Sequence, residues 1–161
     1  MGGLERVISG GQTGVDRAAL DVALARGIAC GGWCPQGRRA EDGPLPARYP
    51  LQETPSEAYA QRTEWNVRDS DGTLILTRGR PPAGGTALTA ECAARWRRPC
   101  LIVDLGEAAD PAALAGWLAA HDIRVLNVAG PRERLAPGIY RDATDYLQSA
   151  LRARRRAAPS S

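Results

Sequence analysis

Short apolar runs alternate with amphipathic stretches along most of this chain. The runs typical of strands are residues 4–9 (LERVIS), 28–30 (IAC), 72–77 (GTLILT), 100–105 (CLIVDL) and 123–129 (IRVLNVA). Strands that are apolar throughout are buried on both faces, and this is the pattern of a parallel sheet between two layers of helices.

The stretches between these runs predict helices. Their ranges are 16–26, about 56–69, 86–97, 110–121 and 139 to about 155. The first helix places its small apolar side chains at i, i+3, i+4, i+7 and i+8 from Val15. Thr13 and Asp16 fit a capping box before it, and Gly27 fits its end. Asp110 followed by Pro111 predicts the start of the fourth helix.

This alternation predicts a single-domain, Rossmann-like, doubly wound α/β fold with a mostly parallel sheet and helices on both faces. A length of 161 residues suits one domain, expected over residues 1–151, with a basic and disordered tail at 152–161. Ligands in this architecture bind at the carboxyl ends of the strands. The Gly/Pro/Arg-rich segment at 31–50 predicts a long loop, and Trp33 and Tyr49 favour an ordered one.

Composition removes several kinds of chemistry. Every basic residue except His121 is an arginine, so a Schiff-base lysine, a pyridoxal-phosphate lysine and a Walker lysine are all excluded. His121, placed late in a helical pattern, suits a helix end better than a catalytic triad. The net charge is +3, and four arginines lie in the tail, at residues 152, 154, 155 and 156. Without these four the net charge would be 3 − 4 = −1, so the tail is basic and the folded body is nearly neutral. A solvated helix end explains this tail better than nucleic-acid binding.

The cysteines form no CxxC pair, and one histidine cannot complete the common zinc sets, so no metal site is predicted. Cys30 and Cys34 are expected to be structural thiols, although a redox or metal role stays open. No apolar run reaches the ~20 residues of a membrane span, and no signal peptide is recognised. These features predict a soluble cytoplasmic protein.

Two glycine turns are the candidate ligand sites. The first, SGGQTG, contains Gly10, Gly11, Gln12, Thr13 and Gly14, and it stands directly before a helix. Backbone N–H groups at a helix start attract anions, and glycines let an anion approach closely. A tight strand-to-helix turn without a ligand explains the same pattern equally well. The carboxylate of Asp16, two residues after the turn, would repel a phosphate.

The second turn, PAGGTALTAE, also follows a strand and precedes a helix. It carries Gly84 and Gly85 as close-approach positions, and Thr86 and Thr89 as hydroxyl donors. Two such turns at neighbouring strand ends could hold one phosphorylated ligand from both sides.

The second turn and the helix before it resemble the Lonely Guy phosphoribohydrolases, whose motif is PGGxGTxxE. Glu91 stands at the offset of the family's glutamate, and Arg62 stands nine residues before Asp71, as the family's arginine does. The resemblance implies that Arg62 and Glu91 are a catalytic pair for nucleotide N-glycosidic cleavage. Ala87 and Leu88 replace the motif's Gly-Thr, which weakens this implication.

A second resemblance covers nearly the whole chain. Six stretches, in order, are similar to the molybdenum cofactor carrier protein family: ISGGQTGVDRAALDVAL, GGWCPQGRRAEDG, RYPLQET, RTEWNVRDSDGTLIL, GGTALT and LNVAGPRE. The family has a Rossmann-like fold, is a distant relative of the Lonely Guy proteins, and is described as carrying molybdenum cofactor, a phosphorylated pterin dithiolene (molybdopterin) with a molybdenum oxo centre. The resemblance implies dimers or tetramers, and a carrier implies a molybdoenzyme or a cofactor-synthesis protein as partner.

Under this resemblance, Arg38 and Arg39 are candidates for the anionic metal end of the cargo, because arginine offers planar, permanently charged donors. Glu41 and Asp42 follow at once, so an internal ion-pair cluster is the alternative. Trp33 is a candidate to stack on the pterin, or else a core residue.

Asn127, Gly130 and Arg132 end another predicted strand and are further candidates for the same cleft. Three hypotheses therefore stand: a carrier of molybdenum cofactor or molybdopterin, a phosphoribohydrolase of nucleoside monophosphates, and a nucleotide-binding module without catalysis.

Overall fold

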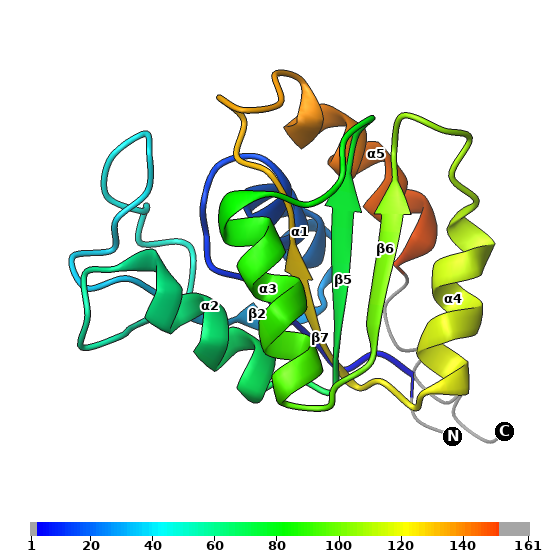
Figure 1. Ribbon diagram of the computed structural model, residues 1–161, viewed down its shortest axis with the longest axis horizontal. Helices are drawn as coiled ribbons and strands as arrows, with labels where there is room; N and C mark the ends of the chain where they lie inside the picture. Colours follow the sequence, from blue (N-terminus) through cyan, green and yellow to red (C-terminus); the bar gives the residue numbers. More distant parts are fainter. Residues whose placement is uncertain (1–2, 152–161) are drawn as a thin grey trace, which may run out of the picture.

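The apolar runs form one parallel sheet in the computed structural model, which describes residues 3–151 (Figure 1). The strands of this sheet are β1 (Arg6–Ile8), β2 (Ala29–Gly31), β5 (Gly72–Thr77), β6 (Cys100–Asp104) and β7 (Val125–Ala129). The helices are α1 (Val15–Arg26), α2 (Tyr59–Arg68), α3 (Gly84–Arg95), α4 (Pro111–Ala120) and α5 (Ile139–Ala150). The predicted tail at 152–161, and the predicted end of the last helix near 155, lie outside the described residues.

The strand order in the sheet is β2-β1-β7-β5-β6, with every neighbouring pair parallel. Helices α1, α4 and α5 cover one face, and α2 and α3 cover the other (Figure 1). The predicted single-domain Rossmann-like α/β fold is therefore confirmed. The helices that follow β1 and β7 lie on one face, whereas the helix that follows β5 lies on the opposite face. The carboxyl ends of β7 and β5 are therefore the switch point at which such sheets bind ligands.

Helix α1 shows how the sequence produces these layers. Its small apolar residues Val15, Ala18 and Ala19 are fully buried between the sheet and α5, since short side chains let the helix approach closely. Gly27 ends the helix in the left-handed conformation at φ 67°, as predicted.

The predicted capping box of α1 is wrong. The N-cap is Gly14, which has no side-chain cap, and the Asp16 carboxylate accepts a hydrogen bond from Gln12 N at 3.3 Å instead. The Thr13 hydroxyl contacts the Glu41 carboxylate and accepts a hydrogen bond from Glu133 N at 3.2 Å. Thr13 thus ties the first turn to two later segments, which no local pattern encodes.

Strand β5 is buried along its whole length, as its sequence predicts, but β6 is not. Because β6 is at the edge of the sheet, Leu101 and Val103 pack into the core on one face while Ile102, on the other face, is 49% exposed. An apolar run alone does not distinguish an edge strand from a central one.

The loop after β2 contains a structure that its sequence did not indicate. β3 (Trp33–Cys34) and β4 (Gln52–Glu53) pair in parallel as a small second sheet, so the ends of the loop lie side by side. Leu45, Tyr49 and Leu51 are buried beneath the loop with Leu20 of α1. This satellite core explains how a segment with so many Gly and Pro residues is ordered.

Candidate small-molecule site at the strand ends

A pocket of about 260 Å³ lies at the carboxyl ends of the central strands. Its walls come from the β1–α1 turn, the inner face of α2, the beginning of α3 and residues 127–132, and we call it the strand-end pocket. The volume is near the lower end of the ~300–1,000 Å³ typical of ligand sites, which suits a small molecule. The pocket contains Gly10, Gln12, Arg62, Gly84, Gly85, Thr86 and Thr89 from the predicted site, and Asn127, Gly130 and Arg132 also line it.

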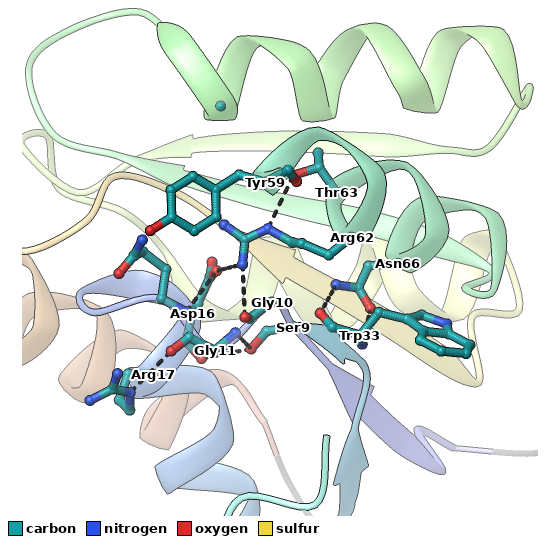
Figure 2. Close-up of polar contacts among 12 residues, drawn as sticks. Ser9, Gly10, Gly11, Asp16, Arg17, Trp33, Tyr59, Arg62, Thr63 and Asn66 are labelled. Carbon is teal, nitrogen blue, oxygen red and sulfur yellow. Dashed lines mark hydrogen bonds and ion pairs between the residues drawn. The ribbon is translucent and has the colours of Figure 1, made fainter. Parts of the chain in front are cut away.

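Arg62 is the central cation of the pocket. Its side chain is only 10% exposed, and Nη1 donates to the carbonyl oxygen of Gly10 at 2.7 Å (Figure 2). Nε donates to the Thr63 hydroxyl at 3.3 Å, and the guanidinium lies 5.1 Å from the centroid of the Tyr59 ring. Nη2 has no hydrogen-bond partner among residues 3–151, yet it is not sealed from solvent. The guanidinium therefore offers free N–H donors to a molecule in the pocket.

Asp16 is the only carboxylate among the pocket-lining residues of the described chain. Its Oδ2 lies 3.9 Å from Nη1 of Arg62, and its side chain is 9% exposed. Burial raises the pKa of the Asp16 carboxyl to about 6, although Arg62 and the Gln12 N–H oppose this shift. Burial likewise lowers the pKa of Arg62, while Asp16 opposes that shift. In the sequence, Asp16 was interpreted as a helix cap and as a group that would repel a phosphate; its place directly after a glycine turn was the available signal of a pocket residue.

The beginning of α3 supplies a second attraction for anions. Its N-cap, Ala83, has no side-chain hydrogen bond to the helix, so the first N–H groups lack a cap. A Cβ atom built on Gly84 or Gly85 would meet nothing within 4 Å, so an anion can approach this backbone closely. Thr86 lines the pocket at the same end, and Thr89 donates its hydroxyl to the carbonyl oxygen of Gly85 at 3.0 Å. The helix dipole adds partial positive charge here.

The first glycine turn is arranged differently from the second. Gly11 N donates to the Ser9 hydroxyl at 3.3 Å, and Thr13 N donates to Oε1 of Gln12 at 3.1 Å. A Cβ on Gly11 would come within 2.7 Å of Leu45, and one on Gly14 within 2.4 Å of the Pro131 carbonyl oxygen. Gly11, Thr13 and Gly14 are outside the pocket lining. The N–H groups of Gly11, Gln12 and Thr13 already have side-chain acceptors within the turn, so α3 is the better place for an anion.

Arg38 is outside the pocket because it holds the long loop together. Its guanidinium donates to four carbonyl oxygens, those of Leu45, Pro46, Tyr49 and Leu51, at 2.9–3.2 Å. The partners of Arg38 are therefore backbone carbonyls. They are not the carboxylates of Glu41 and Asp42, with which an ion-pair cluster was the predicted alternative.

Arg39 also lies outside the pocket lining, but close to it. Its Nη1 donates to the Glu57 carbonyl oxygen at 3.1 Å, and its guanidinium lies 5.6 Å from the centroid of the Tyr59 ring. Tyr59 lines the pocket and also contacts Arg62. Arg39 is thus one side chain away from the site.

Trp33 is directed toward α2 and not into the pocket. Its backbone N–H donates to Oδ1 of Asn66 at 2.8 Å, and its carbonyl oxygen accepts from Nδ2 of Asn66 at 3.0 Å. Nε1 of the Trp33 ring donates to Asp69 at 2.8 Å. The Trp33 ring meets Trp65 edge-on, with the centroids 4.8 Å apart. This packing leaves Trp33 with a structural role that its sequence context did not separate from stacking on a ligand.

Glu91 is exposed on α3 and does not line the pocket, whereas Arg62 is buried within it. The structure therefore does not bring the two predicted catalytic residues together. The carboxylate beside Arg62 is instead that of Asp16, which is contributed by a different element.

The rim of the pocket combines charge with apolar surface. Arg132 lines it and lies 3.9 Å from Oε2 of Glu41, which belongs to the long loop. Leu135, which is 70% exposed, and Leu88 provide apolar contacts at the rim. The pocket therefore offers both cationic donors and apolar surface to a ligand. Within residues 3–151, no group of three His, Cys, Asp or Glu side chains could hold a metal ion, and no helix has the length and hydropathy to cross a membrane.

A Rossmann-like sheet with a pocket at the switch point defines a small-molecule-binding α/β protein. The chain belongs to the circularly permutated YpsA SLOG family, which it matches over residues 7–151. It is also similar to a solved structure from Syntrophus aciditrophicus SB named "Putative molybdenum carrier protein". The two chains are 48% identical with a TM-score of 0.88, over 92% of this chain and 95% of the other. No curated protein matches this chain.

Proposed function

We propose that this protein holds a phosphorylated pterin, such as molybdenum cofactor or molybdopterin, in the strand-end pocket. The family assignment and the name of the Syntrophus relative support a carrier or binding role. The observation that carries the proposal is the uncapped beginning of α3 in the same pocket as the free Nη2 of Arg62. Helix N-termini and arginines are the usual ligands of phosphate in proteins.

In this proposal the phosphate lies against Gly84, Gly85 and Thr86, and Arg62 donates to it from the side. A charge-assisted hydrogen bond of this kind contributes about 1.5–3 kcal/mol, so each such donor matters for affinity. The apolar contacts of the ring come from the rim, at Leu88 and Leu135. Two arginines would then contact the molybdenum-bearing end of the ligand: Arg132, which lines the pocket, and Arg39, which lies beyond Tyr59.

Holding the cargo fits this pocket better than cleaving it. The hydrolase hypothesis needs Arg62 and Glu91 to converge, and Glu91 is exposed outside the pocket lining. Geometry comes before pKa for any acid-base candidate. A carrier also needs a recipient or donor, which we propose is a molybdoenzyme or a cofactor-synthesis protein, and we propose a dimer or tetramer as the working assembly.

Analysis of the ligand that copurifies with the protein tests this function. The protein is purified from cells that make molybdenum cofactor, then denatured and oxidised, and the released material is analysed by fluorescence and mass spectrometry. A fluorescent pterin that is retained by the wild type and lost from Arg62→Lys supports the proposal. Lysine keeps the charge but lacks the second N–H arm, and Arg141→Lys on the exposed face of α5 is the matched control. A copurified nucleotide, or release of free base from a panel of nucleoside monophosphates, would contradict it.

A further inference from the structure

Two polar side chains of the strand-end pocket, Gln12 and Asp16, are not explained by phosphate binding. Both belong to the β1–α1 turn, both are 6% exposed, and both line the pocket. A carboxylate repels a phosphate, so Asp16 does not serve the anionic end of a ligand. A buried polar group that faces a pocket needs a partner of matching chemistry.

The orientation of the Gln12 amide is fixed by its surroundings. Oε1 accepts hydrogen bonds from Thr13 N at 3.1 Å and from Glu41 N at 2.8 Å. Two N–H donors on one atom identify that atom as the oxygen, so the amide cannot be flipped. Nε2 has no hydrogen-bond partner among the described residues and is not sealed from solvent. Gln12 therefore offers the pocket a hydrogen-bond donor.

Asp16 offers the complementary acceptor. Its Oδ2 takes the Gln12 N–H and faces Arg62, whereas Oδ1 has no hydrogen-bond partner within residues 3–151 and is not sealed from solvent. Because Oδ2 is 3.3 Å from the backbone nitrogen of Gln12, the acceptor lies next to the residue that provides the donor. A single flat group could contact both side chains.

We propose that Gln12 and Asp16 recognise the edge of a ring that carries N–H donors beside a carbonyl oxygen. The 2-amino-4-oxopyrimidine ring, which pterins and guanine share, has this edge: its ring N–H and amino group would donate to Asp16, and its carbonyl would accept from Gln12. The inference rests on the proposed function, since it assigns the ring of a ligand whose phosphate lies at α3. It makes these two residues the determinants of ring specificity.

The same arrangement disfavours other rings. Adenine presents an acceptor where guanine presents its ring N–H, so adenine would leave the Asp16 carboxylate facing a lone pair. A site with fixed buried polar groups rejects a ligand that leaves those groups unpaired more strongly than an apolar pocket does. The expected discrimination for one charge-assisted hydrogen bond is about tenfold to a hundredfold.

Calorimetric titration of the full chain at pH 8, where Asp16 is ionised, tests this inference. The probes are neopterin phosphate, guanosine monophosphate, inosine monophosphate, which lacks the amino group, and adenosine monophosphate. Wild type should bind the first two at least about tenfold more tightly than adenosine monophosphate, with inosine monophosphate between them. Whichever of neopterin phosphate and guanosine monophosphate binds more tightly shows whether the natural ring is a pterin or a guanine.

Two isosteric variants assign the effect to residues. Asp16→Asn should bring the guanosine-to-adenosine preference close to unity. Gln12→Glu keeps the oxygen that accepts from Thr13 N and Glu41 N but replaces the donor, and it should weaken binding of guanosine monophosphate. Asp145→Asn, on the exposed side of α5, is the matched control and should change nothing.

Sulfate competition separates the failure of the two proposals. If wild type binds all four probes equally and sulfate displaces each of them, the ring assignment is overturned and the anion site at α3 stands. An unchanged guanosine preference in Asp16→Asn overturns the ring assignment as well. If no probe binds and sulfate has no effect, both proposals fail.

Discussion

The guanidinium of Arg62 lies 3.9 Å from the carboxylate of Asp16, and both side chains are about nine-tenths buried. The pair comes from two elements that meet only in the folded protein, α2 and the first turn of α1. Because Asp16 has a pKa of about 6, the charge of the pocket changes within the pH range in which proteins are handled. Two predictions depend on this relationship.

Anion binding should become tighter as the pH falls through 6. Above that pH the ionised Asp16 offsets the charge of Arg62, and below it the carboxyl is neutral and the cation acts alone. Sulfate is the probe, because it stays a dianion throughout this range whereas a phosphate monoester itself titrates near pH 6. We expect roughly tenfold tighter sulfate binding at pH 5 than at pH 7.5, at constant ionic strength. The sulfate affinity of Asp16→Asn should be nearly independent of pH, and an equal slope in both proteins would contradict the assignment.

The free energy of unfolding should also depend on pH through the protonation of Asp16. The Asp16 pKa is about 6 in the folded protein, above the ordinary value of 3.8 for an aspartate, so Asp16 ionises more readily in the unfolded chain. The stabilising contribution of the protonated carboxyl is fully present below about pH 3.8 and is lost as the pH rises through about 6. Between pH 4 and pH 7 the wild type should lose up to ~3 kcal/mol more stability than Asp16→Asn. Denaturant titrations of both proteins at the two pH values measure this difference, and parallel curves would argue against a raised pKa.

Gly10→Ala should impair the pocket more than the fold. A Cβ at this position would come within 2.2 Å of Nη1 and 2.7 Å of Cζ of Arg62, so the end of that side chain must move. The hydrogen bond from Arg62 to the Gly10 carbonyl would be lost, and the sulfate affinity should fall by about tenfold. Gly116→Ala in α4, where a Cβ meets nothing within 4 Å, is the control; it should leave binding unchanged and stabilise the protein by up to ~1 kcal/mol. Unchanged sulfate binding by Gly10→Ala would remove Arg62 from the anion site.

The fold was predictable because its signals are local. Strand β5 occupies the predicted residues 72–77, and Asp110 caps α4 by accepting a hydrogen bond from Ala112 N at 2.9 Å, as Asp-Pro indicated. The exposed face of β6 was missed because exposure depends on the position of a strand in the sheet, which its own residues do not encode.

The site was only partly predictable because side-chain partners are set over long sequence distances. Arg62 was found through its resemblance to the arginine of the Lonely Guy proteins, but its neighbour Asp16 is far away in sequence and was assigned to a helix cap. Arg38 and Arg39 are equivalent in the sequence, yet one bonds four loop carbonyls and the other extends toward Tyr59. Only the path of the loop decides between these two roles.

Arg38→Ala should therefore destabilise the loop and not the ligand site directly. It removes donors to four carbonyl oxygens, including that of the buried Tyr49, and we expect a loss of roughly 2–4 kcal/mol in the free energy of unfolding. Limited proteolysis should then cut within residues 36–50, whereas Arg39→Ala, which loses one exposed hydrogen bond to Glu57, should resist cleavage like the wild type. Equal protease resistance of the two variants would mean that the carbonyl contacts of Arg38 contribute little.

Two substitutions at Gly85 test whether backbone N–H groups of α3 bind the anion. Gly85 is the second residue of the helix, and a Cβ there meets nothing within 4 Å. Gly85→Ala keeps the N–H, so it should stabilise the helix slightly and preserve sulfate binding. Gly85→Pro removes that N–H at a helix position where proline is tolerated, because an N–H of the first turn has no partner within the helix. The preceding residue, Gly84, has no Cβ, so one of the two groups that clash with a proline Cδ is absent there.

We expect Gly85→Pro to lower the sulfate affinity by about tenfold to a hundredfold, the value of one hydrogen bond to a charged group. Thermal unfolding should show a midpoint close to that of the wild type, which separates lost binding from lost structure. Because the pocket also contains Arg62, binding should weaken and not vanish, and combining Gly85→Pro with Arg62→Lys should abolish it. If Gly85→Pro folds and binds sulfate as well as Gly85→Ala does, the anion does not lie on this helix and the phosphate must be sought elsewhere in the pocket.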